Sequence, residues 1–326
     1  MRSLLIPGTD LQPSVIALGT VALGSTLGEA ASFRLLDRFL DLGGTFLDTA
    51  RVYSDWLPGE RSRSEKMLGR WLAARGHRDR VVLATKGGHP PMENMRRGRL
   101  SRGDIQSDLE ASLADLRTDV VDLYWLHRDD PAHPVEDIVD TLNDLADSGA
   151  IRAFGASNWS AARIREANAY AGRAGLRPFV ANQMLWSLAD PNPGSIGDPT
   201  LVTMDDATAD LHRETGLAAV PYSSQANGFF GGKYGPGRKG VDSPSARQVQ
   251  KLYYNSANFG RLERVEEVAA RLGRSPNAVA LAALMAESFP VFPIIGAYTL
   301  EQLEDSVGAG DLALDAETAE YLRTER

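Results

Sequence analysis

The chain has 326 residues, 43% hydrophobic and 24% charged, and it contains no cysteine, which excludes disulfides, thiol catalysis and thiolate metal sites. Its formal net charge is −8 without a long basic stripe, so nucleic acid is not an expected partner. No apolar run approaches the roughly 18 residues of a membrane span, and the first ten residues are too short of apolar side chains for a secretory signal, so we expect a cytoplasmic protein with no membrane association.

Short apolar runs separated by turn residues predict a β-hairpin over about residues 3–17, which leads into a first strand. Apolar strands then alternate with segments of helical periodicity. The later strands are expected near residues 45–47, 81–85, 121–126, 150–156, 178–182, 217–221 and 291–295. Helices are expected near residues 29–42, 64–74, 101–116, 134–147, 160–171, 204–214, 261–272 and 276–287, and a short one begins at Thr299.

Residues 223–259 interrupt this alternation. They show no clear periodic segment, and glycine is frequent among them. We expect a long loop there, and loops of this length are usually functional or disordered.

Polar side chains stand at the carboxyl ends of successive predicted strands. They lie 26 to 41 residues apart, about one strand plus one helix, and are Asp48, Lys86, His127, Ser157, Gln183 and Tyr222. Strands alternating with helices predict a parallel sheet, and functional residues at many strand ends favour a closed (β/α)8 TIM barrel with long βα loops. An open doubly wound sheet would show a G-x-G-x-x-G sequence after its first strand, and none is found. The prediction is therefore a single α/β barrel domain over residues 1–326.

Four side chains at or near three of these strand ends suit proton transfer: Asp48, Tyr53, Lys86 and His127. A tyrosine titrates near ~10 in water, and a buried lysine paired with a carboxylate would lower that pKa. A histidine within hydrogen-bond reach could orient a carbonyl oxygen. Such a set would protonate a developing alkoxide while a hydride arrives from elsewhere.

The sequence Asp48–Tyr53 (DTARVY), with the lysine and the histidine that end the next two strands, resembles the catalytic tetrad of the aldo-keto reductases. The resemblance runs from the N-terminal hairpin to about Ser306. It implies hydride transfer between NAD(P)H and a small-molecule carbonyl compound, an aldehyde or a ketone, with Tyr53 as the general acid. A monomer and a small homo-oligomer both remain open.

The resemblance also implies where a nicotinamide cofactor would bind. Short polar side chains at adjacent strand ends would hold the carboxamide, and an aromatic side chain after the seventh strand would stack on the ring; here these are Ser157, Asn158, Gln183 and Tyr222. The stretch that follows resembles the family's pyrophosphate loop, with Ser223, Gln225 and Gly228 offering mostly backbone contacts. Gly19 and Thr20, which end the first strand, are assigned to the same cofactor site.

The adenosine end of the cofactor would lie at Gly296, Tyr298, Gln302, Asp305 and Ser306. The family often has an arginine where this chain has Tyr298, and a tyrosine cannot clamp a 2′-phosphate as a guanidinium does. Both NADP and NAD therefore remain open, with NADP slightly favoured by the resemblance.

Aromatic and charged residues near the strand ends suggest a polar substrate, such as a sugar or a hydroxylated aldehyde. They are Trp56, Arg128, Asp129, Trp159 and Trp186, and the three tryptophans could equally be packing residues of the barrel rim. No metal site is expected, because only His127 of the five histidines ends a strand.

Two other classes of protein remain as alternatives. One is a cofactor-binding regulatory module, like the barrel subunits of potassium channels, with the tetrad but little turnover. The other is a metal-dependent barrel hydrolase, which would need several His or Asp ligands at strand ends.

Overall fold

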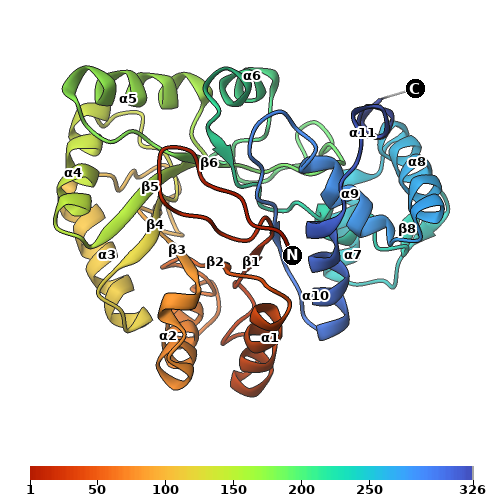
Figure 1. Cartoon of the computed structure of the whole chain (residues 1–326), viewed down its shortest axis with the longest axis horizontal. Helices are drawn as coiled ribbons and strands as arrows, with labels where there is room; N and C mark the ends of the chain where they lie inside the picture. The colour runs from red at the N-terminus through yellow and green to blue at the C-terminus, as the bar shows by residue number, and fades with distance from the viewer. Residues whose placement is uncertain (325–326) are drawn as a thin grey trace.

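The computed structural model describes residues 1–324, and within them eight parallel strands form one sheet (Figure 1). The strands are β1 (Ala17–Gly19), β2 (Phe46–Asp48), β3 (Val82–Gly87), β4 (Val121–Leu126), β5 (Ile151–Ser157), β6 (Ala181–Gln183), β7 (Ala218–Ala219) and β10 (Ile294–Ile295). Their spatial order is β10-β1-β2-β3-β4-β5-β6-β7. A separate antiparallel pair is formed by β8 (Tyr234–Gly235) and β9 (Arg238–Lys239).

The sheet closes on itself between β7 and the segment that leads into β10. Ala219 forms a parallel bridge with Val291, and the backbone N–H of Phe292 donates to the Ala219 carbonyl at 2.8 Å. The N–H of Ile294 donates to the carbonyl of Pro221 at 2.9 Å. These contacts complete the (β/α)8 barrel, so the predicted fold class is confirmed.

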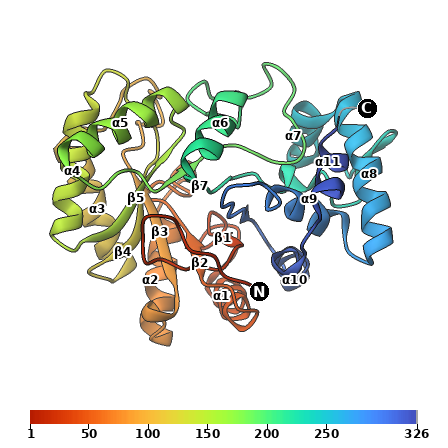
Figure 2. The same cartoon turned by 45° about the horizontal axis from the view of Figure 1, so that its top comes forward.

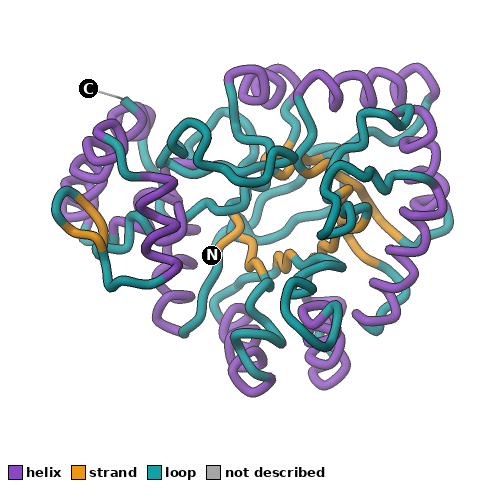
Figure 3. Tube along the Cα trace, turned by 180° about the vertical axis from the view of Figure 1, so that it is seen from behind, coloured by secondary structure: helices purple, strands orange, loops and turns teal. Residues whose placement is uncertain are grey.

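Helices surround the strands (Figure 3), and α7, α8, α9 and α11 gather on one side of the molecule (Figure 2). The helices are α1 (Glu29–Asp41), α2 (Arg63–Arg75), α3 (Arg102–Leu116), α4 (Val135–Asp147), α5 (Ala161–Ala174), α6 (Asp206–Thr215), α7 (Pro244–Tyr253), α8 (Ser256–Leu272), α9 (Pro276–Leu284), α10 (Leu300–Val307) and α11 (Ala316–Arg323). Short 3₁₀ turns are η1 (Arg78–Arg80), η2 (Ala226–Gly228) and η3 (Gly308–Asp311). Up to residue 324, none of the helices combines the length and apolar character needed to cross a bilayer.

Side-chain alternation along each strand decides which residues enter the barrel. One strand residue in two joins the interior core, which includes Phe46, Ala84, Leu123, Trp125, Ala153 and Ala181. The period of two then directs the polar residues near the strand ends into the same interior; they are Asp48, Lys86, His127, Ser157 and Gln183. The barrel therefore collects these side chains at the carboxyl ends of its strands, where a (β/α)8 barrel carries its active site.

The predicted hairpin is present and lies at the opposite end of the barrel. Ser3 and Ser14 form an antiparallel bridge, and the N–H of Ile6 donates to the carbonyl of Leu11 at 2.9 Å. The side chains of Ile6 and Leu11 belong to the same buried cluster as the inward residues of the strands. The hairpin thus fills the amino-terminal end of the barrel and leaves the carboxyl end for function.

The prediction of a long loop over residues 223–259 is wrong in its second half. That half holds α7 and the first turn of α8, and the β8–β9 hairpin precedes them. Ser243 caps α7 by accepting from the N–H of Ala246 at 3.1 Å, and Pro244 occupies the first turn. The buried face of α7 follows helical spacing, with Ala246, Val249 and Tyr253 buried, but the glycine-rich stretch before it hides this pattern.

Candidate active site

Lys86 connects the members of the predicted tetrad. Its Nζ lies 2.5 Å from Oδ2 of Asp48, at the end of β2, and 2.8 Å from the hydroxyl of Tyr53 in the turn that follows β2. It also donates to the carbonyl of Thr49 at 2.8 Å. All three ammonium hydrogens thus have an acceptor, which is what a buried lysine requires. Sequence analysis did not identify the Thr49 carbonyl, because every residue has a backbone carbonyl and the residue type does not show which one acts as an acceptor.

The ion pair is fully enclosed: Lys86 is 1% exposed and Asp48 is 0% exposed. Burial lowers the pKa of Lys86, whereas the neighbouring Asp48 carboxylate raises it. The second oxygen of Asp48 accepts from Nε2 of Gln183, at the end of β6, at 3.0 Å. Asp48 therefore ties β2 to both β3 and β6.

Tyr53 keeps its proton in this environment. Burial raises the pKa of Tyr53 well above its usual range, the charge of Asp48 raises it further, and Arg128 opposes both. The net direction is thus opposite to the lowering that we expected for the phenol's pKa, because complete burial beside a carboxylate outweighs the charge of Arg128. The phenol is neutral near pH 7 and holds a transferable proton.

His127 follows β4 and lies over the same spot. Its ring centroid is 6.1 Å from that of Tyr53, edge to face, and 4.8 Å from that of His89. Burial lowers the pKa of His127 well below its usual range, and the charge of Arg128 lowers it further. Its Nδ1 is buried without a hydrogen-bond partner in the part of the chain that the structure describes. A neutral imidazole of this kind can donate a hydrogen bond to a substrate oxygen without carrying charge.

His89 is a neighbour that sequence analysis missed. It follows the Gly87-Gly88 pair at the end of β3, and its Nδ1 lies 2.6 Å from the carbonyl of Pro90. The sequence feature that could have indicated His89 as a site residue is its position two residues after the end of β3. Its packing against His127 makes it part of the site's wall.

The residues assigned to the carboxamide lie together. The hydroxyl of Tyr222 donates to Oδ1 of Asn158 at 2.7 Å, and Nδ2 of Asn158 is 3.1 Å from Oγ of Ser157. Asn158 also donates to the carbonyl of His127 at 3.2 Å. Its left-handed φ of 60° turns the chain immediately after β5, a conformation that asparagine tolerates better than most residues. The carboxamide residues therefore border the tetrad.

The residues assigned to the pyrophosphate and adenosine also converge. Gln225 donates to Oγ of Ser306 at 3.0 Å and accepts from the N–H of Gly296 at 2.8 Å. Asn277, in the first turn of α9, donates to Asp305 at 2.9 Å and was missed because it stands outside the motif that carries the resemblance. Tyr298 is 55% exposed beside this cluster. Around it, Gln302 accepts from the N–H of Tyr298 at 2.9 Å.

The polar side chains of this cluster lie beside the exposed Tyr298. Such a polar surface suits a polar ligand such as a dinucleotide. The loop after β7 adds left-handed backbone at Ser223 and Gly228, and a Cβ built at Gly228 would meet nothing within 4 Å. Successive turns of this kind aim N–H groups outward, as anion-binding loops do. The residues predicted for the pyrophosphate and the adenosine therefore lie in groups whose chemistry suits such a ligand.

Gly19 and Thr20 are placed differently from the other cofactor residues. A Cβ at Gly19 would lie 2.8 Å from Cγ2 of Ile294, so this glycine allows β1 and β10 to approach closely. The hydroxyl of Thr20 is buried, donates to the carbonyl of Asp48 at 2.9 Å and lies 2.8 Å from Oγ of Ser64. Both residues support the strand that carries Asp48: Gly19 has no side chain to reach a ligand, and the Thr20 hydroxyl is already bonded within the protein.

The five predicted substrate residues divide into three groups: tryptophans that are exposed or line a cavity, charged residues paired within the protein, and one buried tryptophan. Trp56 is 56% exposed beyond the Tyr53 turn, and Trp186 lines a cavity of about 310 Å³ formed with residues 185, 187, 189–194, 196, 203 and 204. Arg128 is held by the Thr200 hydroxyl at 2.9 Å and Asp198 at 3.2 Å. Asp129 lies 3.4 Å from Arg163.

Trp159 forms the third group, and its assignment as a substrate wall is corrected. Its side chain is fully buried in the core. It packs edge-on against Phe179 at 5.2 Å, while the guanidinium of Arg163 lies over its ring. A ring that is covered on these sides belongs to the barrel's packing.

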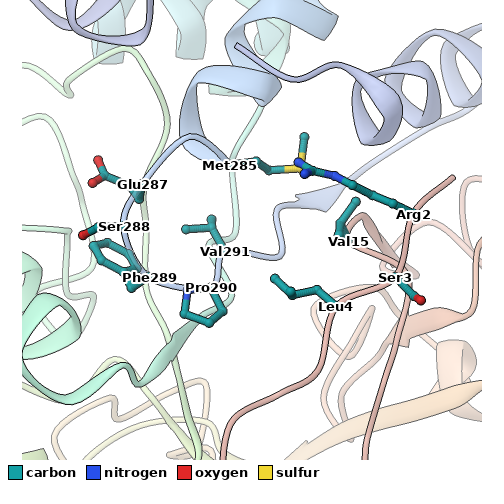
Figure 4. A pocket seen from close by; sticks show the side chains of 10 residues that line it. All are labelled: Arg2, Ser3, Leu4, Val15, Met285, Glu287, Ser288, Phe289, Pro290 and Val291. Carbon is teal, nitrogen blue, oxygen red and sulfur yellow. The ribbon is translucent and has the colours of Figure 1, made fainter. Parts of the chain in front are cut away.

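A second cavity has a volume of about 330 Å³. Figure 4 shows the side chains that line it. It is bounded by the N-terminal hairpin at Leu4 and Val15 and by the chain before β10 at Phe289–Val291. These segments precede their strands, so this cavity is remote from the tetrad. Within residues 1–324, no group of three or more His, Asp or Glu side chains is arranged to hold a metal ion.

Comparison with known sequences agrees with this geometry. A profile described as "Aldo/keto reductase family" matches residues 15–324. The NADP(+) aryl-alcohol dehydrogenase of Phanerodontia chrysosporium is 30% identical over 98% of this chain and 84% of its own length. The uncharacterized oxidoreductase YrpG of Bacillus subtilis is 32% identical, covering 96% and 92%. Norsolorinic acid reductase stcV of Emericella nidulans is 32% identical, covering 93% and 76%.

A barrel whose strand ends gather a buried lysine–aspartate pair, a neutral tyrosine and a neutral histidine defines a class of oxidoreductase that works on carbonyl groups. The chain belongs to the aldo/keto reductase family. It is an NAD(P)-dependent oxidoreductase that transfers a hydride between a nicotinamide cofactor and a carbonyl compound. The alternative of a regulatory module with little turnover finds no support among these relatives.

Proposed function

We propose that Tyr53 is the general acid of this oxidoreductase, and that Lys86 and Asp48 make its proton transferable. The observation that carries the proposal is the position of Lys86 Nζ, within hydrogen-bond distance of both Asp48 and the Tyr53 hydroxyl. Lys86 donates to the phenol oxygen, and the phenol's own hydrogen makes only a long contact with Oδ2 of Asp48, at 3.5 Å, so it can turn to a substrate oxygen.

The reduced nicotinamide, when bound, supplies the hydride that forms the new C–H bond at the carbonyl carbon. The electron pair of the C=O π bond then moves to oxygen, and that oxygen takes the proton of Tyr53. The phenolate left behind is stabilised by the ammonium of Lys86, 2.8 Å away. Because burial keeps the pKa of Tyr53 high, the proton stays in place until the alkoxide develops.

His127 has a complementary role in the proposal. Its pKa is lowered by burial and by the charge of Arg128, so the ring stays neutral at pH 7. A neutral ring N–H near the phenol can hold the carbonyl oxygen in line with the Tyr53 hydroxyl. Orientation of this kind contributes to rate because it is established before the reaction.

For the cofactor we propose NADPH with a modest preference over NADH. The printed name of one relative, an NADP(+) aryl-alcohol dehydrogenase, favours NADPH. The exposed Tyr298 weakens the preference, because a phenol offers one hydrogen bond to a 2′-phosphate where a guanidinium offers a charged, two-pronged one. Ser157, Asn158 and Tyr222 would face the nicotinamide end, and the Gln225–Ser306 group the adenosine end.

For the substrate we propose a polar carbonyl compound such as a hydroxylated aldehyde or a sugar. Trp56 offers an exposed aromatic face, and Arg128 is a buried cation whose charge acts on Tyr53, His127 and His89. A buried guanidinium braced by Asp198 and Thr200 favours substrates that carry hydrogen-bond acceptors. A panel of aldehydes matched in size tests this point, and faster turnover of the apolar members would reject it.

The role of Tyr53 is tested by Tyr53→Phe, which removes the hydroxyl and keeps the ring. Turnover should fall by at least ~10²-fold, the low end for a positioned acid. The affinity for NADPH, measured by fluorescence titration, should be nearly unchanged. Turnover close to that of the wild-type protein would show that another group delivers the proton.

A further inference from the structure

The turn that carries Tyr53 has no regular secondary structure to hold it. After β2 the chain makes successive tight turns, in which the N–H of Tyr53 donates to Ala50 and that of Asp55 donates to Val52, both at 3.1 Å. Ser54 is left-handed, with a φ of 72°, which is strained for a residue with a side chain. The position of the phenol must therefore be fixed by contacts from outside the turn.

Arg51, two residues before Tyr53, supplies several of these contacts, alongside the Ser54 hydroxyl, which donates to the Val21 carbonyl at 3.0 Å, and Asp55, which accepts from the N–H of Ser62 at 2.8 Å. Its backbone N–H donates to the carbonyl of Lys86 at 3.1 Å, which joins the turn to β3. Its guanidinium donates to the hydroxyl of Ser62, the residue before α2, and to Asp115 of α3 at 2.6 Å. It lies 3.7 Å from Oε2 of Glu65 in α2. One side chain thus ties the turn to two neighbouring helices.

Glu65 is the buried partner in this cluster. It is 0% exposed, and its Oε1 accepts from the hydroxyl of Thr85 at 2.5 Å. Its Oε2 has no hydrogen-bond partner within residues 1–324, so Arg51 is the nearby cation that compensates it. Thr85 directly precedes Lys86, so the cluster reaches the strand that holds the other half of the catalytic contact.

Close packing of α2 on α3 fixes the carboxylate of Asp115, the other acidic partner of Arg51. A Cβ at Gly69 of α2 would lie 2.1 Å from the carbonyl oxygen of Asp115, so only glycine allows this approach. The cluster is therefore anchored in rigid elements. It contrasts with Arg70 and Glu29, which pair at 2.9 Å on the surface, where such pairs contribute little to stability.

We propose that Arg51 is a positioning residue for catalysis, which holds the Tyr53 hydroxyl against Lys86 by fixing the turn to Ser62, Asp115 and Glu65. The inference rests on the proposed role of Tyr53 as the acid. Displacement of a reacting group by about 1 Å can lower turnover by as much as ~10²-fold. Loss of Arg51 should therefore act on the chemical step and leave the cofactor site, which lies at other strand ends, intact.

The experiment compares Arg51→Met, Arg51→Lys and the surface control Arg70→Met in the full-length protein. Turnover is measured at saturating NADPH and aldehyde, and the concentration of active sites is set by the stoichiometry of NADPH binding. Arg51→Met should lower kcat at least ~10-fold, with the NADPH dissociation constant unchanged. Arg51→Lys should recover part of the loss because it keeps a cation opposite Asp115. Arg70→Met should match the wild-type protein.

Tyr53→Phe is measured in the same series to separate the two proposals. If Tyr53→Phe loses turnover while Arg51→Met keeps wild-type kcat, the positioning role is wrong and the acid assignment stands. If Tyr53→Phe itself keeps turnover, the acid assignment fails first. A fall in the active-site concentration of Arg51→Met at unchanged kcat would mark a purely structural role and would also overturn the inference.

Discussion

Gln183 donates a hydrogen bond to Oδ1 of Asp48 at 3.0 Å, while Lys86 occupies Oδ2 at 2.5 Å. The residue that the resemblance assigns to the nicotinamide carboxamide is thus bonded directly to the carboxylate of the proposed tetrad. Both oxygens of Asp48 are engaged, as a fully buried carboxylate requires. A substitution of Lys86 should therefore also alter the hydrogen bond between Asp48 and Gln183.

Lys86→Met should cost both activity and stability, because it leaves Asp48 buried without its cation. Breaking a buried ion pair in this way typically costs about 3–5 kcal/mol. Adding Asp48→Asn removes the stranded charge and should restore most of the free energy of unfolding, measured with denaturant, but none of the turnover. If the double variant is no more stable than the single one, the pair is not electrostatically coupled.

Tyr298→Arg should raise the affinity for NADPH and leave that for NADH nearly unchanged. The guanidinium would add a charged, two-pronged contact to the 2′-phosphate, which NADH lacks. A gain of about 1.5–3 kcal/mol for a hydrogen bond between charged groups corresponds to roughly 10- to 100-fold in the dissociation constant. Fluorescence titration measures both constants. Equal gains for the two cofactors would place Tyr298 away from the phosphate.

Glu65→Gln should make stability less dependent on pH. Burial raises the pKa of Glu65 to about 7 in the folded protein, whereas the unfolded chain has the ordinary value near ~4.3. The folded state therefore binds a proton that the unfolded state has lost, and stability is greatest below the unfolded pKa and falls as pH rises towards about 7.

The glutamine variant lacks this titration. Its free energy of unfolding should rise relative to that of the wild-type protein by up to about 3 kcal/mol between pH 4.5 and pH 8. Denaturant unfolding at several pH values measures the difference. A constant difference across this range would show that Glu65 titrates normally.

Gly69→Ala should destabilise the protein although alanine is the better helix former. The added methyl would lie 2.1 Å from the backbone oxygen of Asp115, and overpacking of this kind costs about 1–3 kcal/mol. Gly172→Ala in α5 is the matched control, since a Cβ there meets nothing within 4 Å. The control should be stabilised by up to about 1 kcal/mol. Thermal unfolding compares the pair, and shifts of the same sign would contradict the packing argument.

The strands and the convergence of Asp48, Lys86 and His127 were predictable because strand periodicity and side-chain direction are linked. Once Phe46 and Trp125 are placed inside the barrel, the period of two fixes Asp48 and His127 as inward residues. The helix over residues 102–116 was predictable for a similar local reason: Ser101 caps it by accepting from the N–H of Asp104.

What escaped prediction depends on contacts distant in sequence. Nothing local distinguishes Trp56, which is exposed, from Trp159, which packs on Phe179. The burial of Glu65 follows from the approach of α3, 50 residues further along the chain at Asp115. The balance of burial against charge at Tyr53 likewise depends on the final geometry, and it reversed the expected direction of the pKa.

The hairpin that fills the amino-terminal end of the barrel also sets the order in which the protein can fold. Ile6 and Leu11 belong to the same buried cluster as Phe292 and Ile294, almost the whole chain length away. Bringing such remote segments together costs loop-closure entropy before any contact is gained. The interior core can therefore be completed only after the last barrel strand has been synthesised. We expect the barrel to close slowly and late in folding, and its apolar interior to be accessible to chaperones until then.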